Sequence, residues 1–352
     1  MIDLDDEVAI RASDPGNMID VVAGLPHHCL EGHRLGLGAS PPPVAEGITA
    51  LAFCGMGGSA VAGDVIAALG APHLPVPVQV VRSPVLPAYC RTDTLVLVSS
   101  YSGNTAEALG CFEEAVRRGC RLAVLTSGGR LAARAHELGL PRVPLPEGFQ
   151  PRAALGYLAL GSLGLLEGLG WLPPMGEDLR LAAGDLTTLA ATLGPSVPTS
   201  VNPAKRLAVG IGDRVPVIWG AEGIGAVAAD RWRTQMNENG KVAAWSSALP
   251  ELDHNEVVGW SEDQGERFCV IALRHEGDHP DVADRFDLSG QIARSAGART
   301  EEVWARDSSM LGRFLSLVMV GDFTSVYVGV RRGIDPTPID AIARLKRALS
   351  AT

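Results

Sequence analysis

Three hydroxyl side chains follow a buried apolar run in the first third of the chain. They belong to the stretch Leu95-Val-Leu-Val-Ser-Ser-Tyr-Ser-Gly-Asn-Thr-Ala-Glu-Ala-Leu109. Gly103 permits a tight turn, and Asn104 or Thr105 caps a helix whose free N–H groups attract anions. Hydroxyls from Ser100, Ser102 and Thr105, without a lysine or arginine, suit a phosphate monoester better than a nucleotide chain, which usually needs a P-loop lysine or magnesium.

A second glycine-rich turn lies upstream, between a strand-like run that ends at Cys54 and a helical run. Gly55, Gly57 and Ala60 fit the G-x-G-x-x-A pattern of dinucleotide-binding folds. The next predicted strand ends in Arg82, where an NAD site has an acid, so only an NADP version of this interpretation stays open. The structural alternative is that any α/β protein places glycine where a strand meets a helix.

The two loops together, Gly-Met-Gly-Gly-Ser59 and Ser100-Tyr-Ser-Gly-Asn-Thr105, resemble those of the sugar isomerase (SIS) domain, a parallel-sheet module that binds phosphosugars. In that family, hydroxyl side chains hold the sugar phosphate. The resemblance assigns this role to Ser59, Ser100, Ser102 and Thr105, and it makes Gly57 and Gly58 part of the substrate-binding loop.

Composition narrows the class of protein. The 352 residues suffice for two domains of ordinary size, and a hydrophobic content of 46% indicates compact cores. The net charge of −10, without a basic run, argues against nucleic acid or an anionic membrane as a partner. Six cysteines lack metal-ligand spacing, and the acidic N-terminus does not resemble a signal peptide, so we expect a cytoplasmic protein with reduced thiols.

One stretch, from Ala153 to Leu172, is long and apolar enough to raise the question of a membrane span. It contains Glu167 and five glycines and lacks a basic flank beyond Arg152. A buried helix that connects two domains is therefore the favoured interpretation.

Short buried runs alternate with helical stretches, which predicts parallel βαβ units whose loops form a site at the carboxyl ends of the strands. We expect an α/β fold of two tandem SIS domains, each a parallel sheet flanked by helices, the second a degenerate copy without the hydroxyl loop. The duplication supports the SIS resemblance, and the loss of the hydroxyl loop from the second copy predicts one phosphate site per chain. The expected strands are 48–54, 76–82, 94–100, 121–127, 142–145, 215–220, 268–274 and 301–305. The expected domains are a lead-in and linker over 1–43, SIS domain 1 over 44–150, a helical connector over 151–200, SIS domain 2 over 201–332 and a terminal helix over 333–352.

Side chains suited to acid/base chemistry lie in three further segments. Arg152 lies at the start of the apolar helix. A helix start normally disfavours a cation, so an arginine there suggests an anionic ligand or a carboxylate partner. Glu238 and His254 belong to a polar region of carboxylates beside an imidazole, the parts of an acid/base site, although composition alone favours a hydrated loop. Only three of the 30 basic residues are lysines, and Lys346 adjoins the apolar stripe of an amphipathic terminal helix.

Taken in order along the chain, these segments resemble the bifunctional phosphoglucose/phosphomannose isomerases of archaea and bacteria. The resemblance implies a metal-independent, cofactor-free dimer that interconverts glucose 6-phosphate or mannose 6-phosphate with fructose 6-phosphate. It assigns Glu238 as catalytic base, Arg152 to the enediolate, Lys346 to ring chemistry, and His254 to ring opening in the site of the neighbouring subunit. Thr337 is a candidate for the small hydroxyl residue that the family ties to its dual specificity.

Two alternatives belong to other classes. A non-catalytic phosphosugar sensor would need the hydroxyl loops but not Glu238, His254 and Lys346. An NADP oxidoreductase would need nucleotide binding at the glycine turn that precedes Ser59.

Overall fold

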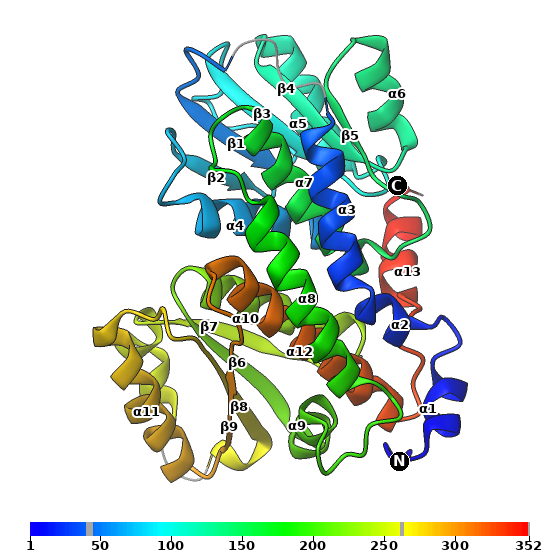
Figure 1. Cartoon of the computed structure of the whole chain (residues 1–352), viewed down its shortest axis with the longest axis vertical. Coiled ribbons are helices and arrows are strands. Elements are labelled where there is room, and N and C mark those ends of the chain that lie inside the picture. Colours follow the sequence, from blue (N-terminus) through cyan, green and yellow to red (C-terminus); the bar gives the residue numbers. More distant parts are fainter. Residues whose placement is uncertain (40–44, 261–263, 351–352) are drawn as a thin grey trace. The chain divides into compact units, whose positions relative to one another are not determined.

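The computed structural model describes residues 1–39, 45–260 and 264–350. The chain forms two compact units (Figure 1). We call residues 24–187 with 307–315 the first-sheet unit, and residues 1–23, 188–306 and 316–352 the second-sheet unit. Both units are built from segments that are discontinuous in sequence.

A five-stranded, wholly parallel sheet forms the centre of the first-sheet unit, in the order β2-β1-β3-β4-β5. Its strands are β1 (Ala50–Cys54), β2 (Val78–Val81), β3 (Thr94–Ser99), β4 (Arg121–Thr126) and β5 (Arg142–Pro144). All five predicted strands are therefore confirmed. Since helices cover both faces of a parallel sheet, its central strands are continuous apolar runs, as all six buried residues of β3 show.

Helices α4 (Gly58–Gly70), α5 (Ala106–Arg118) and α6 (Gly129–Glu137) follow β1, β3 and β4. The chain order reverses between β1 and β3, which is the switch point where α/β sheets bind ligands. Both predicted phosphate loops follow these two strands.

Helices α3 (Leu25–Leu37) and α7 (Leu155–Gly168) pack together through glycines. A Cβ added at Gly36 would lie 2.1 Å from the carbonyl oxygen of Gly161, so the two backbones touch. Within the expected lead-in and linker over 1–43, the linker was predicted to begin at Gly36, but Gly36 and Leu37 form the end of α3, while residues 40–43 lie outside the described residues. Helix α7 is almost wholly buried, as predicted for this apolar stretch, and all of it lies within the first-sheet unit.

The second-sheet unit contains a four-stranded parallel sheet in the order β7-β6-β8-β9. Its strands are β6 (Val215–Ala221), β7 (Trp245–Leu249), β8 (Phe268–Arg274) and β9 (Arg299–Trp304). Strand β7 was not predicted, because it is a half-exposed edge strand whose sequence, Trp-Ser-Ser-Ala-Leu, lacks an apolar run. Fold class is confirmed: both units contain a parallel sheet flanked by helices.

Several helices belong to this unit, of which α10 and α11 contact the sheet. The helices of the unit are α9 (Pro203–Ile211), α10 (Ile224–Glu238), α11 (Pro280–Ser295) and, partly in this unit, α8 (Gly176–Leu193) and α12 (Met310–Arg331), with α1 (Glu7–Ser13), α2 (Met18–Ala23) and α13 (Asp340–Ser350) from the chain ends. Helix α9 was not predicted, although Asn202 accepts a hydrogen bond from the Lys205 amide and Pro203 occupies its first turn, both recognisable start signals. Helix α12 is long and apolar enough to cross a membrane, but 94% of its apolar window is buried inside the structure, as in the core of a globular protein.

Candidate active site

Two loops at the switch point of the first sheet form a cradle of hydroxyl groups, built from Ser59, Ser100, Ser102 and Thr105. The amide of Tyr101 donates to Ser59 Oγ over 3.2 Å, which joins the two loops. Ser100 Oγ donates to Thr105 Oγ1 over 2.9 Å. The structure thus links three of the four predicted phosphate ligands, and both Ser59 and Ser100 are buried.

Ser102 is the exposed member of the hydroxyl cradle, and its Oγ accepts from the Asn104 amide over 3.3 Å. Thr105 occupies the N-cap position of α5, as predicted, but its side chain makes no capping hydrogen bond because the hydroxyl faces Ser100. Gly103 has a φ of +66°, and a Cβ there would lie 1.8 Å from the carbonyl oxygen of Gly128. Only glycine fits this turn.

The backbone of Arg152 lies against Gly58, the residue before Ser59 of the hydroxyl cradle. It sits in the short 3₁₀ turn η1 (Pro151–Ala153), and its residue is 2% exposed. A Cβ added at Gly58 would lie 2.9 Å from the Pro151 carbonyl oxygen and 3.1 Å from Arg152 Cα. The glycine loop of α4 and the arginine turn therefore touch through their backbones. Gly57, with a φ of +53°, makes the bend that allows this approach.

Tyr101 is a positioning residue that the sequence interpretation missed. Its hydroxyl donates to the Pro146 carbonyl over 2.7 Å and accepts from the Phe149 amide over 2.9 Å. It therefore anchors the segment that leads to Arg152 onto the loop that carries Ser100. Its place inside the Ser-Tyr-Ser-Gly motif was the available signal.

Phe149 of the same segment belongs to an aromatic cluster. The ring of His28 stacks on Tyr157 and meets the edge of Phe149, with centroids 4.9 Å apart in both cases. Burial, with a smaller contribution from the neighbouring His27, lowers the pKa of His28 to about 4. His28 is therefore a neutral packing residue at neutral pH.

Glu238, the predicted base, is the last residue of α10 in the second-sheet unit. It lines a cavity of about 410 Å³ together with Asn237, Lys241 and residues of the 334–342 segment. Lys241 Nζ donates to the carbonyl oxygen of Glu238 and, over 2.9 Å, to that of Pro336. The end of α10 is thereby tied to the segment that enters α13.

A buried polar network fixes α10 against α12. Arg231 Nη2 lies 2.6 Å from Asp322 Oδ2, and Gln235 donates to the other carboxylate oxygen over 3.0 Å. One turn further, Asn239 Nδ2 donates to Ser325 Oγ over 3.0 Å. Burial raises the pKa of Asp322, while Arg231 opposes that change. These contacts hold the helix that presents Glu238.

His254 and Lys346 complete the predicted set. His254 ends the 3₁₀ turn η2 (Glu251–His254) and is exposed. The adjacent Asp253 accepts from Arg285 over 3.0 Å and from Ser289 over 2.6 Å, which fastens the turn to α11. The backbone of Lys346 lies in α13, but its side chain is outside the described part of the structure.

Thr337, the candidate specificity residue, lies against Gly16. A Cβ at Gly16 would fall 2.1 Å from Thr337 Oγ1, and Thr337 is not among the residues that line the Glu238 cavity. Pro338 and Ile339, by contrast, line that cavity.

At the switch point of the second sheet the chemistry differs from that of the first. Strand β8, the counterpart of β3, ends in Arg274, whose guanidinium lies 4.6 Å from the Trp304 ring centroid and 5.1 Å from that of Phe286. It also pairs with Asp287 over 2.8 Å. Arginine, aromatic rings and carboxylates stand here in place of the hydroxyl cradle.

Two parallel sheets, a glycine turn and a hydroxyl turn at a switch point define an α/β protein of the SIS class. Residues 200–349 match the family described as the bacterial phospho-glucose isomerase C-terminal SIS domain. The tagatose-6-phosphate ketose/aldose isomerase of Escherichia coli has a similar fold, with a TM-score of 0.71 at 15% identity, over 92% of this chain and 96% of that one.

The sequence comparisons are more specific. A bifunctional phosphoglucose/phosphomannose isomerase of Caldicellulosiruptor bescii is 34% identical over 95% of this chain and 99% of its own length. A D-glucosamine-6-phosphate 4-epimerase of Sulfolobus acidocaldarius is 31% identical over 84% of this chain and 88% of its own. The chain belongs to the bifunctional phosphoglucose/phosphomannose isomerase family, which confirms the resemblance seen in the sequence.

Proposed function

We propose that the protein is an aldose–ketose isomerase that interconverts glucose 6-phosphate and mannose 6-phosphate with fructose 6-phosphate through a cis-enediolate. Family membership supports this reaction. The structural observation that carries it is the backbone contact between Gly58 of the hydroxyl cradle and Arg152. This contact supports the role of Arg152, because its backbone adjoins the loop to which we assign phosphate binding, and a nearby cation would stabilise an anionic intermediate.

The phosphate is held by the hydroxyl cradle. Ser59 and Ser100 are already oriented by hydrogen bonds, and the cradle adjoins the starts of α4 and α5, whose first N–H groups lack helical acceptors. Hydrogen bonds to a charged group contribute roughly 1.5–3 kcal/mol each. Hydroxyl and amide donors therefore bind the dianion although the protein carries a net charge of −10.

The proton transfers are assigned to residues of the second-sheet unit. Glu238 removes the proton from C2 of the aldose and returns it to C1, so one carboxylate serves both carbons. Arg152 stabilises the negative charge of the enediolate. His254 moves the proton that opens the sugar ring, and Lys346 assists this ring chemistry.

The experiment that tests the base replaces Glu238 with Gln. This substitution keeps the size of the side chain but removes the proton acceptor, so exchange of solvent deuterium into fructose 6-phosphate should stop while phosphosugar binding persists. Glu177→Gln on the surface of α8 is the matched control and should leave exchange unchanged. Exchange retained in Glu238→Gln would remove Glu238 from this role, and a wild-type protein that binds without any exchange would identify a sensor.

Product analysis by NMR tests the substrate assignment. Incubation with fructose 6-phosphate should yield both glucose 6-phosphate and mannose 6-phosphate. Because one relative is named as a 4-epimerase, the spectra should also be examined for inversion at C4 with glucosamine 6-phosphate as substrate. Epimerisation there, without aldose formation from fructose 6-phosphate, would refute the isomerase assignment.

We further propose a cytoplasmic homodimer in which His254 acts in the neighbouring subunit's site. The exposure of His254 supports this arrangement. Mixed refolding of Glu238→Gln with His254→Ala tests it, because a mixed dimer would combine an intact Glu238 from one chain with an intact His254 from the other. Recovered activity is expected, and no recovery would place His254 in its own chain's site.

A further inference from the structure

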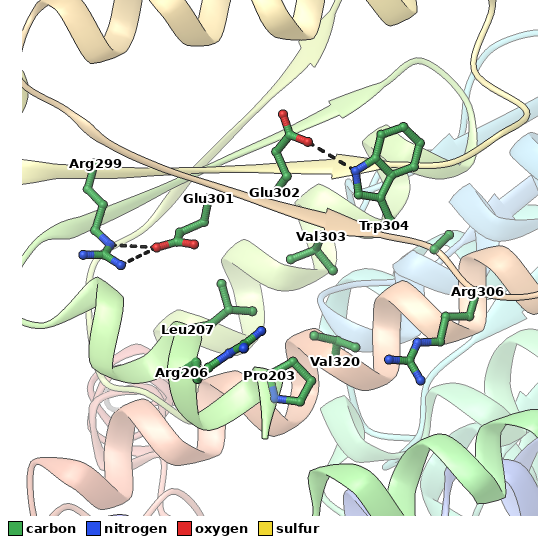
Figure 2. Close-up of a pocket in the computed structure, with 11 residues that line it drawn as sticks. Pro203, Arg206, Leu207, Arg299, Glu301, Glu302, Val303, Trp304, Arg306 and Val320 are labelled. Atoms are coloured by element: carbon green, nitrogen blue, oxygen red, sulfur yellow. Dashed lines mark hydrogen bonds and ion pairs between the residues drawn. The ribbon is translucent and has the colours of Figure 1, made fainter. Parts of the chain in front are cut away.

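A cavity of about 480 Å³ lies in the second-sheet unit along β9, the edge strand of its sheet (Figure 2). Strand β9, helix α9 and helix α12 enclose it. It shares no residue with the hydroxyl cradle or with the Glu238 cavity. Its volume falls within the range of roughly 300–1,000 Å³ that is typical of small-molecule sites.

Three arginines line this cavity, in a protein whose net charge is −10. Arg299 is bound by Glu301 through two contacts of 2.8 and 2.5 Å, and its guanidinium packs over Gly210 of α9. The second lining carboxylate, Glu302, accepts from Trp304 Nε1 over 3.2 Å. Both acids are therefore already engaged by groups of the cavity wall.

The other two arginines are differently placed. Arg206 projects from α9 and Arg306 follows β9, and in Figure 2 their side chains flank Val320 of α12. Both residues are exposed, and neither guanidinium pairs with a carboxylate within residues 1–39, 45–260 and 264–350. The cavity thus offers two guanidinium groups that no acid of the described chain neutralises.

We infer that this cavity is a second anion site, which binds a small phosphorylated metabolite through Arg206 and Arg306. A guanidinium group can donate two parallel hydrogen bonds to two oxygens of one phosphate, in a fixed geometry. Leu207, Val303 and Val320 supply an apolar wall for the carbon skeleton of such a ligand. The chemistry differs from that of the cradle, where hydroxyls and amides are the donors.

Equilibrium dialysis of the full chain with radiolabelled inorganic phosphate and with fructose 6-phosphate tests this inference. Two sites per chain are expected for each probe. The double variant Arg206→Gln/Arg306→Gln should weaken one site by about tenfold or more, since hydrogen bonds to charged groups are lost, and leave the other intact. The double variant Ser100→Ala/Thr105→Ala should weaken the hydroxyl-cradle site and leave the Arg206/Arg306 site intact.

The double variant Arg134→Gln/Arg180→Gln controls for loss of the same charge, because both arginines lie on the surface of the first-sheet unit. Phosphate binding at one site or two that the Arg206/Arg306 variant leaves unchanged would overturn the inference, as would the absence of any binding. A single site that only the Arg206/Arg306 variant weakens would support the inference and refute phosphate binding by the hydroxyl cradle. Binding of a glutamate-rich peptide at these arginines, without binding of either phosphate probe, would also overturn it. Since dialysis does not depend on turnover, these outcomes are independent of the proposed isomerase reaction.

Discussion

Replacing Gly58 with Ala would test the contact between the hydroxyl cradle and Arg152 directly. The new Cβ would lie 2.9 Å from the Pro151 carbonyl oxygen and 3.1 Å from Arg152 Cα, whereas ordinary contacts begin at 3.4 Å. The turn must therefore move by 0.5 Å and 0.3 Å at these two atoms. Both atoms belong to the backbone, so rotation of a side chain cannot relieve the overlap.

The magnitude follows from this displacement. A misplacement of about 1 Å at a reacting group costs about 100-fold in rate, so 0.3–0.5 Å corresponds to about 4- to 10-fold on the same logarithmic scale. Stability should change less: overpacking costs about 1–3 kcal/mol, while alanine in place of glycine at the start of α4 returns up to about 1 kcal/mol. We therefore expect kcat/KM to fall about 4- to 10-fold in a folded protein.

The assay compares kcat/KM for fructose 6-phosphate with the free energy of unfolding in urea. Gly184→Ala on α8 is the control, because a Cβ there would meet nothing within 4 Å. The control should keep full activity and gain up to about 1 kcal/mol of stability. If Gly58→Ala keeps kcat/KM within twofold of the wild type, the loop does not position Arg152 and the reasoning fails.

Two further predictions concern the same unit. Ser100→Ala or Thr105→Ala should each raise KM for phosphosugars by roughly 10- to 100-fold, because a hydrogen bond to a charged phosphate contributes about 1.5–3 kcal/mol; unchanged KM values would displace the cradle. Because burial lowers the pKa of His28 from 6.5 to about 4, protonation favours the unfolded chain. The stability that depends on neutral His28 is complete above pH 6.5 and is lost as the pH falls to about 4, a change of about 3 kcal/mol. Urea unfolding at several pH values should show this loss in the wild type and a smaller loss in His28→Gln; equal losses would contradict the assignment.

Most of the strands that were predicted correctly are buried strands that consist largely of apolar residues. Strand β3, wholly buried, is a continuous apolar run, whereas β7 pairs along one edge only and half-exposes its serines. Strand β7 belongs to the sheet because it pairs with β6, and this pairing cannot be predicted from the local sequence of β7. Helix α9 was overlooked despite its Asn-Pro start, because no long apolar stripe follows that start.

Some parts of the candidate site could be predicted from the sequence and others could not. The hydroxyls of Ser59, Ser100 and Thr105 could be grouped in advance, since loops at the carboxyl ends of neighbouring parallel strands must meet. The anchoring by Tyr101 and the contact of Gly58 with Arg152 could not, because both depend on the path of the 146–152 segment over the sheet edge. Thr337 was a candidate through the family resemblance alone, and its contact with Gly16 depends on the path of the chain ends, which the local sequence does not indicate.

The interleaving of the two units has a consequence for how the protein is made. Residues 307–315 complete the first-sheet unit, and residues 1–23 belong to the second, so neither is a continuous stretch that a ribosome releases as a finished domain. The amino-terminal segment must wait for nearly the whole chain to emerge before its own unit exists. A single cut between residues 187 and 188 would leave both halves without part of their core, so folding to completion becomes an event of the full-length polypeptide.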